Sequence, residues 1–331
     1  MKRILVIRID FLGDMVCTTP LIHLLKKRWP DSEIHVLANK YNRAVLDRNP
    51  DVAAIHSYVY SKQCERNERP GRLNALLDRL ALILRLRRLK FDLLIVPNGG
   101  MHKNSIQFAR QLNVKDIRWH DRETEFDDRN PEHVAHRPMR HEALSGLLLT
   151  PELGSIDTGA LKLSVYPDSA LRAEWGNVLG HRHKPRVGLF VSNKNGARRW
   201  DVHKWKRLAI SLNECAEVFI FLDPSEPQSN AQFDGLPARC IGASSVADLT
   251  AAMSLLDLVV SADSAPVHLA AALRLPVVAM FEDRPEKYLR WYPLGVPSVL
   301  LREGPRVDDI SLETVNEAVR AMLLNEADFV K

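Results

Sequence analysis

The chain has 331 residues, of which 46% are hydrophobic and 26% charged, and its formal net charge is +5. This length exceeds one ordinary hydrophobic core and fits two domains of roughly 150 residues each. No stretch approaches the roughly 20 apolar residues of a membrane-spanning helix, so we expect a soluble globular protein. The small basic excess permits a polyanionic partner, such as nucleic acid, an anionic membrane face or a phosphorylated sugar, without choosing among them.

The first apolar run, residues 3–9, predicts a buried strand and not a signal peptide. Arg8, Asp10 and Asp14 interrupt the apolar stretch, and no small-residue cleavage site follows. The four cysteines are far apart and form no CxxC pair, which suits a reducing compartment and argues against a structural zinc site. We therefore expect a cytoplasmic protein.

Short apolar runs alternate with helix-length amphipathic segments in the first half of the chain. The runs are typical of strands and lie at residues 3–9, 33–39, 53–58, 91–98 and 116–120. The segments between them predict helices near residues 14–29, 41–48, 72–89, 103–112 and 138–149. Because the strand segments lack alternating polar residues, we expect a parallel sheet covered by helices on both faces.

The same alternation repeats in the second half. Strands are predicted at residues 186–192, 217–223, 238–243, 256–263, 276–281 and 298–302. Helices are predicted near residues 202–213, 245–256 and 265–274, with a last helix at 309–327. Residues 164–186 hold two prolines, two glycines and a basic cluster, which is typical of a connection. We expect two α/β domains, residues 1–166 and 167–331, with a ligand cleft between the carboxyl ends of their sheets.

A glycine and a carboxylate stand in "FLGDMVCTTP", where the first strand should turn into a helix. Gly13 would let the chain turn sharply, and Asp14 would then lie at the ligand-binding edge of the sheet. A carboxylate there can act as a general base. Asp14 can also cap the helix, as Asp often does, and the residues alone favour this interpretation.

A second turn, in "LDLVVSADSAPVHLAAALRLPVVAMF", separates a buried strand from a helix rich in alanine. Asp263 ends the strand, and Ser264 and Ala265 leave the helix N-terminus uncrowded. Its backbone N–H groups could hold a phosphate or diphosphate. An Asp cap on a core helix is an equally good interpretation, and His268 taken alone favours a structural histidine.

The opening segment and the DxxxxH turn at 263–268 together resemble glycosyltransferase family 9, the ADP-heptose:lipopolysaccharide heptosyltransferases. The resemblance extends to "FDLLIVPNGGMHKNSIQFARQL", "HEALSGLLL" and "NGARRWDVHKWKRLA", and so covers most of the chain. It implies the GT-B fold, with two Rossmann-like doubly wound domains, an interdomain cleft and a last helix that packs back on the first domain. It also implies an inverting, metal-independent transfer of a heptose or related sugar from ADP-heptose to a lipopolysaccharide inner-core or other surface-glycan acceptor.

The resemblance also assigns roles to individual residues. Asp14 matches the family's general base, Arg198 takes the place of a phosphate-binding lysine, and Glu226 matches a glutamate that holds the donor ribose. The donor-binding residues it implies are Ser192, Lys194, Arg198, Glu226, Asp263, Ser264, Ala265 and His268. The acceptor-binding residues it implies are Gly13, Lys62, Arg66, Arg69 and Lys103. For the basic residues, a merely solvated loop is the alternative interpretation.

The chain departs from the family pattern after the strand at 276–281. Glu282 and Asp283 replace a glycine and a small turn, and put acid close to the expected position of the donor phosphates or sugar. Ser264 stands where Thr-Gly is more usual, which keeps a hydroxyl. These departures bear on which donor is used and leave the fold and Asp14 untouched.

Rival chemistries find little support in the sequence. The nearest approach to a metal-binding DxD motif is at residues 121–125, and His133, His136 and His141 lack a second ligand set, so we predict no metal and no cofactor besides the nucleotide sugar. No GxGxxG follows a strand, and no P-loop motif occurs.

The helix at 72–89 is predicted to cover the sheet with one face and to show charge on the other. Contact of its basic side with a membrane is the alternative, so a peripheral contact at the cytoplasmic face of the inner membrane stays open, and we predict no nucleic-acid partner. Two other functions also remain open: a GT-B transferase with another nucleotide sugar and a non-lipid acceptor, and a non-catalytic α/β protein that binds nucleotides or anions.

Overall fold

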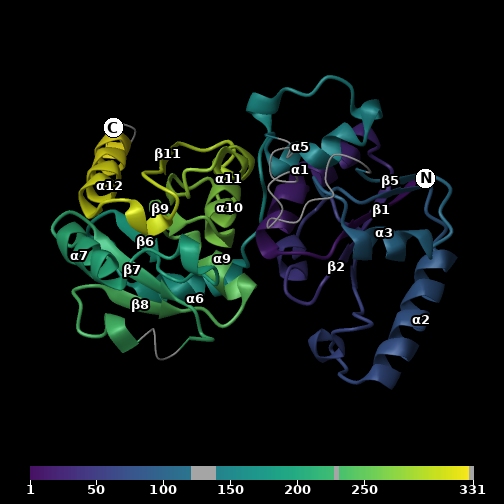
Figure 1. Cartoon of the computed structure of the whole chain (residues 1–331), viewed down its shortest axis with the longest axis horizontal. Helices are drawn as coiled ribbons and strands as arrows, with labels where there is room; N and C mark the ends of the chain where they lie inside the picture. Colours follow the sequence, from purple (N-terminus) through teal and green to yellow (C-terminus); the bar gives the residue numbers. More distant parts are fainter. Residues whose placement is uncertain (121–138, 227–230, 328–331) are drawn as a thin grey trace. The chain divides into compact units, whose positions relative to one another are not determined.

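The computed structural model describes residues 1–120, 139–226 and 231–327 (Figure 1). The chain divides into two compact units, Met1–Leu161 and Lys162–Lys331. Each unit contains one parallel β-sheet, which confirms the predicted α/β class. No helix within the described ranges is both long and apolar enough to cross a membrane.

The sheet of the first unit has the strand order β3-β2-β1-β4-β5, and every neighbouring pair is parallel. Its strands are β1 Arg3–Arg8, β2 Glu33–Ala38, β3 Ala54–Ser57, β4 Leu93–Ile95 and β5 Ile117–Arg118. Its helices are α1 Leu12–Arg28, α2 Arg72–Arg88, α3 Lys103–Arg110 and α5 Glu142–Leu148.

The alternation of side chains along β1 assigns its residues to the two faces of the sheet. Leu5 and Ile7 belong to a core cluster with residues of α2 and α3. Arg8 has the opposite parity, and its guanidinium contacts side chains of α1 and α5. A buried arginine is thereby placed on the face that α1 and α5 cover.

The helix predicted at 41–48 is wrong, because only a short 3₁₀ turn, Arg43–Leu46, forms there. Asn39 and Asn42 bond each other's backbone, with N–H to side-chain oxygen distances of 2.9 Å in both directions. Such local bonds offer the backbone an alternative to the helix. The predicted helix at 138–149 is confirmed from Glu142 onward, and residue 138 lies outside the described residues.

Helix α1 continues through Pro20, which has no N–H for the carbonyl of Val16. The hydroxyl of Thr19 donates to that carbonyl at 2.7 Å. The threonine in "TTP" thus supplies the hydrogen bond that the proline removes, and the helix keeps its length.

The sheet of the second unit has the order β11-β10-β9-β6-β7-β8, again with parallel neighbours. Its strands are β6 Arg186–Phe190, β7 Glu217–Leu222, β8 Arg239–Gly242, β9 Leu258–Ala262, β10 Val277–Met280 and β11 Ser298–Leu301. Its helices are α6 Ser169–Leu179, α7 Val202–Leu212, α9 Val246–Met253, α10 Ala265–Ala272, α11 Pro285–Trp291 and α12 Leu312–Ala327. Helices α7 and α12 pack against each other and share one core cluster with the sheet.

Two helices of this unit escape the sequence-based prediction. Helix α6 lies inside the stretch 164–186, which was predicted to be a connection. Asp168 caps it by accepting from two backbone N–H groups, and Gly180 ends it with a φ of 71°. Helix α11 was not predicted, although Pro285 stands in its first turn, where proline is favoured.

Gly146 is required by the packing of α5 on the first unit's core. A Cβ at this position would lie 2.8 Å from both Leu21 and Pro97. Gly146→Ala is therefore expected to lower the free energy of unfolding by ~1–3 kcal/mol, the usual cost of overpacking. Urea unfolding followed by circular dichroism measures this change.

Gly176→Ala in α6 is the matched control, because a Cβ there meets nothing within 4 Å. It is expected to stabilise the protein by about 0.5–1 kcal/mol through the helix propensity of alanine. Equal stability of both variants would contradict the packing argument.

Candidate functional site

In each sheet, polar side chains lie near the switch point, which is where the strand order changes direction. In the first unit this point lies between β1 and β4, and in the second between β6 and β9. Parallel α/β domains bind ligands outside the carboxyl ends of strands at such switch points. Each unit therefore has its own candidate site.

The candidate site of the first unit is an acid cluster, which consists of Arg8, Asp10, Asp14 and Glu142. The Arg8 Nε donates to Asp10 Oδ1 at 2.8 Å, and its Nη2 donates to Glu142 Oε1 at 2.9 Å. The same Nη2 also donates to Asp14 Oδ1. The Arg8 side chain is 2% exposed and that of Asp14 13%, so a buried cation organises three carboxylates, which come from the segment after β1, from α1 and from α5.

Two residues of the segment after β4 also bond the acid cluster. Asn98 Nδ2 donates to Asp10 Oδ2 at 2.7 Å, and the backbone N–H of Gly99 donates to Glu142 Oε1 at 2.9 Å. Both residues belong to the "PNGG" sequence that ends the fourth predicted strand. The carboxylates of Asp10 and Glu142 are thus fixed by neutral donors as well as by Arg8.

Asp14 is the third residue of α1 and does not cap it, because the N-cap position is Phe11. Burial raises the pKa of Asp14 to about 7, and the neighbouring charge of Asp10 adds to the rise. A carboxylate with a pKa near the working pH is well suited to accept a proton from a hydroxyl. Gly13 lies within the first turn of α1 and is not among the glycines with positive φ, so the expectation that its backbone freedom makes the turn is wrong.

The acid cluster carries more negative than positive charge. Three carboxylates face one guanidinium, and burial raises the pKa of Asp10 as well. His102, which precedes α3, does not add a cation: burial, with the charge of Arg8, lowers its pKa to about 4. The imidazole Nδ1 instead lies 2.7 Å from the Ser105 hydroxyl and caps α3. Binding of a proton by one of the carboxylates would reduce this excess of negative charge.

The predicted acceptor residues lie on two different segments. Lys103 is the exposed first residue of α3, which follows the interior strand β4. Lys62, Arg66 and Arg69 lie between the edge strand β3 and α2, where Arg66 stacks 5.6 Å above the ring of Tyr60. Arg69 pairs with Asp78 of α2 at 3.1 Å.

The candidate site of the second unit centres on Arg198. Its Nη1 lies 3.2 Å from Asp263 Oδ2, and its Nε lies 3.4 Å from Glu282 Oε2. These carboxylates follow β9 and β10, and their side chains are 7% and 6% exposed. Glu282, the departure from the family pattern, therefore holds the arginine that was predicted to bind phosphate.

The turn after β9 brings several predicted donor residues together. Asn193 Nδ2 donates to the Asp263 carbonyl at 3.1 Å, which ties the exits of β6 and β9. Ser264 is the N-cap of α10, yet its hydroxyl donates to the Ala262 carbonyl at 2.9 Å and does not cap the helix. The helix begins at Ala265, and His268 is buried with its ring 5.7 Å from that of Trp291.

A cavity of about 350 Å³ opens beside the same strand exits. The residues that line it include Ser192, Asn193, Arg199, Trp205 and Glu226. Arg199 Nη2 lies 3.2 Å from Glu226 Oε1, and the buried Trp205 indole N–H has no hydrogen-bond partner among the described residues. Lys194 is exposed and follows the lining residue Asn193 in the chain.

Sequence reasoning assigned no role to Arg8 or Glu142, although both contact the predicted base or its neighbours. One signal was visible: a charged residue at the end of a run as apolar as "RILVIR" needs a buried counter-charge. The partner, Glu142, lies 134 residues away, and no spacing rule connects the two.

The comparisons with known proteins agree with this geometry. The family model of glycosyltransferase family 9 (heptosyltransferase) matches residues 79–308. The chain is 24% identical over 285 residues to lipopolysaccharide heptosyltransferase 3 of Escherichia coli, covering 82% of this chain and 81% of the relative.

Two solved structures share the fold. A family 9 glycosyltransferase from Veillonella parvula DSM 2008 aligns with a TM-score of 0.78 and 19% identity, covering 98% of both chains. ADP-heptose lps heptosyltransferase II of E. coli aligns with a TM-score of 0.74 and 20% identity, covering 99% of this chain and 100% of the other. With a fold of the GT-B type and a family match over most of its length, the chain is a glycosyltransferase and belongs to glycosyltransferase family 9.

Proposed function

We propose that this glycosyltransferase transfers a heptose from ADP-heptose to a lipopolysaccharide inner-core acceptor, with inversion at the anomeric carbon. The observation that carries the proposal is Asp14, a buried carboxylate with a raised pKa at the switch point of its sheet. The names of the similar proteins support the substrates, since they include a lipopolysaccharide heptosyltransferase and an ADP-heptose lps heptosyltransferase. In this proposal residues 1–166 bind the acceptor and residues 167–331 bind the donor.

The chemistry is a single displacement. Asp14 accepts the proton of the acceptor hydroxyl as its oxygen attacks the anomeric carbon, and ADP leaves from the opposite side. Arg8 and Glu142 are positioning residues. Arg8 Nη2 donates to the carboxylates of both Asp14 and Glu142, so Glu142 holds the guanidinium that orients Asp14. One base suffices for an inverting displacement, and the proposal assigns that role to Asp14.

The leaving diphosphate needs positive charge or hydrogen-bond donors. Arg198 and the first-turn N–H groups of α10 supply both at the same strand exits, so the proposal requires no metal. Ser192, Lys194 and Glu226 would contact the rest of the nucleotide, with Glu226 accepting from the ribose hydroxyls. In this proposal Asp263 and Glu282 orient Arg198 and offset its positive charge.

Removal of the Arg198 side chain is expected to weaken donor binding. Arg198→Ala should raise the Kd for ADP by about 10- to 100-fold, as expected for the loss of charge-assisted hydrogen bonds worth about 1.5–3 kcal/mol. Arg198→Lys should recover part of the loss, because it keeps the charge but not the planar fork. Isothermal titration calorimetry measures both.

Arg207→Ala, an exposed arginine on α7, is the control and should leave the Kd unchanged. A Kd for Arg198→Ala equal to that of the wild type would remove Arg198 from the donor site.

A calorimetric screen of ADP, UDP and GDP, followed by turnover of the matching nucleotide sugars, tests the function. The proposal predicts that ADP binds most tightly and that ADP-heptose is consumed only when the acceptor is present. Preference for another nucleotide would favour the alternative transferase, and binding without turnover would favour a non-catalytic protein.

A further inference from the structure

Helix α2 exposes a stripe of large apolar side chains. Its leucine face consists of Leu73, Leu76, Leu77, Leu80 and Leu84, which are 42–70% exposed. Their spacing of three and four residues places them on one side of the helix. Ala75, Leu82 and Leu86, the buried residues of α2, lie on the opposite side.

This arrangement differs from the prediction that the outer side of α2 would be charged. A helix that is apolar on two opposite sides is normally covered on both. Contiguous exposed apolar side chains of this kind mark an interaction surface. The leucine face is therefore an unpartnered surface of the first unit.

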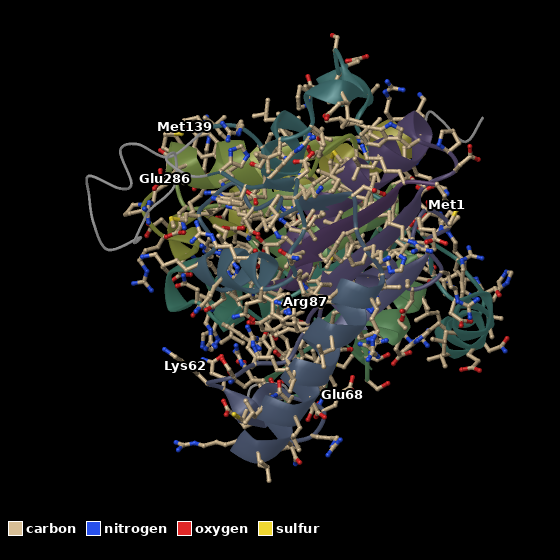
Figure 2. All side chains as sticks on the ribbon, turned by 90° about the vertical axis from the view of Figure 1, so that its right-hand side faces the viewer. Met1, Lys62, Glu68, Arg87, Met139 and Glu286 are labelled. Atoms are coloured by element: carbon tan, nitrogen blue, oxygen red, sulfur yellow. The ribbon has the colours of Figure 1, made fainter. Side chains whose placement is uncertain are left out.

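Basic side chains surround the leucine face. Residues 61–90 contain nine lysines and arginines and three acidic residues, so this stretch has a net charge of +6 while the whole chain has +5. Arg72, Arg85 and Arg88 are exposed on the helix. Figure 2 labels Arg87 on the same helix and Lys62 on the loop before it. An apolar stripe flanked by cations matches the interface of an anionic lipid bilayer.

We propose that the leucine face of α2 docks the protein on an anionic lipid surface, with the leucines entering the acyl boundary and the arginines contacting phosphate headgroups. Docking of a second copy on the same face would bring two patches of like charge together, which disfavours that occupant. The inference deepens the proposed function, since a lipid-linked acceptor is presented at a bilayer, but its test requires no turnover.

Flotation of the full chain with lipid vesicles tests the proposal. The wild type should bind vesicles of phosphatidylcholine with phosphatidylglycerol, and bind phosphatidylcholine alone much more weakly. L76S/L77S/L80S should lower the vesicle affinity by at least about tenfold, since each leucine loses apolar burial. R72Q/R88Q should lower it by about fivefold per arginine, with an effect that fades at high salt.

L148S/L324S is the matched control, because these leucines are 61% and 71% exposed on other helices. It should bind vesicles as the wild type does, and all variants should keep the wild-type Tm and Kd for ADP. No binding by the wild type, or undiminished binding by the leucine variant, would overturn the docking proposal. So would a wild-type dimer that the leucine variant dissociates, or a preference for a DNA duplex over vesicles.

Turnover separates this proposal from the proposed function. Transfer to a soluble, deacylated acceptor without vesicle binding would refute only the docking. Vesicle binding without consumption of ADP-heptose would refute only the transferase substrate.

Discussion

Asp14→Asn is expected to lower kcat by ~10²- to 10⁴-fold, the usual contribution of a general base. The Kd for ADP should change by less than about twofold, because the substitution keeps the shape of the side chain and lies in the other unit from the donor site. Steady-state release of ADP and calorimetry measure the two effects separately.

The same variant has a predicted effect on stability. The pKa of Asp14 is about 7 in the folded protein, against an ordinary value of 3.8. The folded state therefore binds the proton more tightly, and the stability contributed by this group is full below pH ~4 and lost as the pH rises through about 7. Asp14→Asn cannot ionise, so its unfolding free energy should exceed that of the wild type at pH 8, with a difference that shrinks toward pH 4.

Asp10→Asn is the control for both effects, because it also removes one carboxylate charge from the acid cluster. Its kcat should fall less than that of Asp14→Asn, since in this proposal Asp10 contacts Arg8 and Asn98 and does not accept the substrate proton. An equal loss of kcat in the two variants would contradict the assignment of Asp14 as the base.

Arg8→Met is expected to lower the free energy of unfolding by ~3–5 kcal/mol at pH 8, because it leaves buried carboxylates without their cation. At pH 5 the loss should be smaller, since burial raises the pKa of Asp10 and Asp14, which can then take up protons in the folded state. Urea unfolding at the two pH values measures the difference.

Arg118→Met provides the comparison within the same unit. Arg118 also bonds two carboxylates, Asp116 at 2.7 Å and Glu152 at 2.6 Å, but both of these acidic side chains are more than a third exposed. Its loss should cost about 1 kcal/mol or less, as for surface ion pairs. An equal loss of unfolding free energy in the two arginine variants would mean that burial does not determine how much Arg8 contributes to stability.

The sequence predicted the sheets well because their strands are continuous apolar runs, such as "RILVIR" and "EVFIFL", that only burial on both faces explains. It failed where short-range side-chain bonds decide whether a helix forms. Asn39 and Asn42 turned the predicted helix 41–48 into a 3₁₀ turn, and the cap of Asp168 started α6 inside a presumed connection.

The candidate site was predictable only in part. Asp14 and Asp263 were found because each ends or follows a buried strand, which places polar residues at the ligand-binding edge. The partners of these residues come from distant segments: Glu142 reaches Arg8 across 134 residues, and Glu282 reaches Arg198 across 84. Such contacts depend on strand order and helix packing, which local patterns do not specify.

The most direct test of the central claim is a single-turnover reaction of ADP-heptose with a lipopolysaccharide inner-core acceptor, with the product linkage determined by nuclear magnetic resonance. We expect one ADP to be released for each heptose transferred, the anomeric configuration to be inverted, and Asp14→Asn to slow the transfer by ~10²- to 10⁴-fold. Retention of configuration, or transfer by Asp14→Asn at the wild-type rate, would contradict the proposed mechanism.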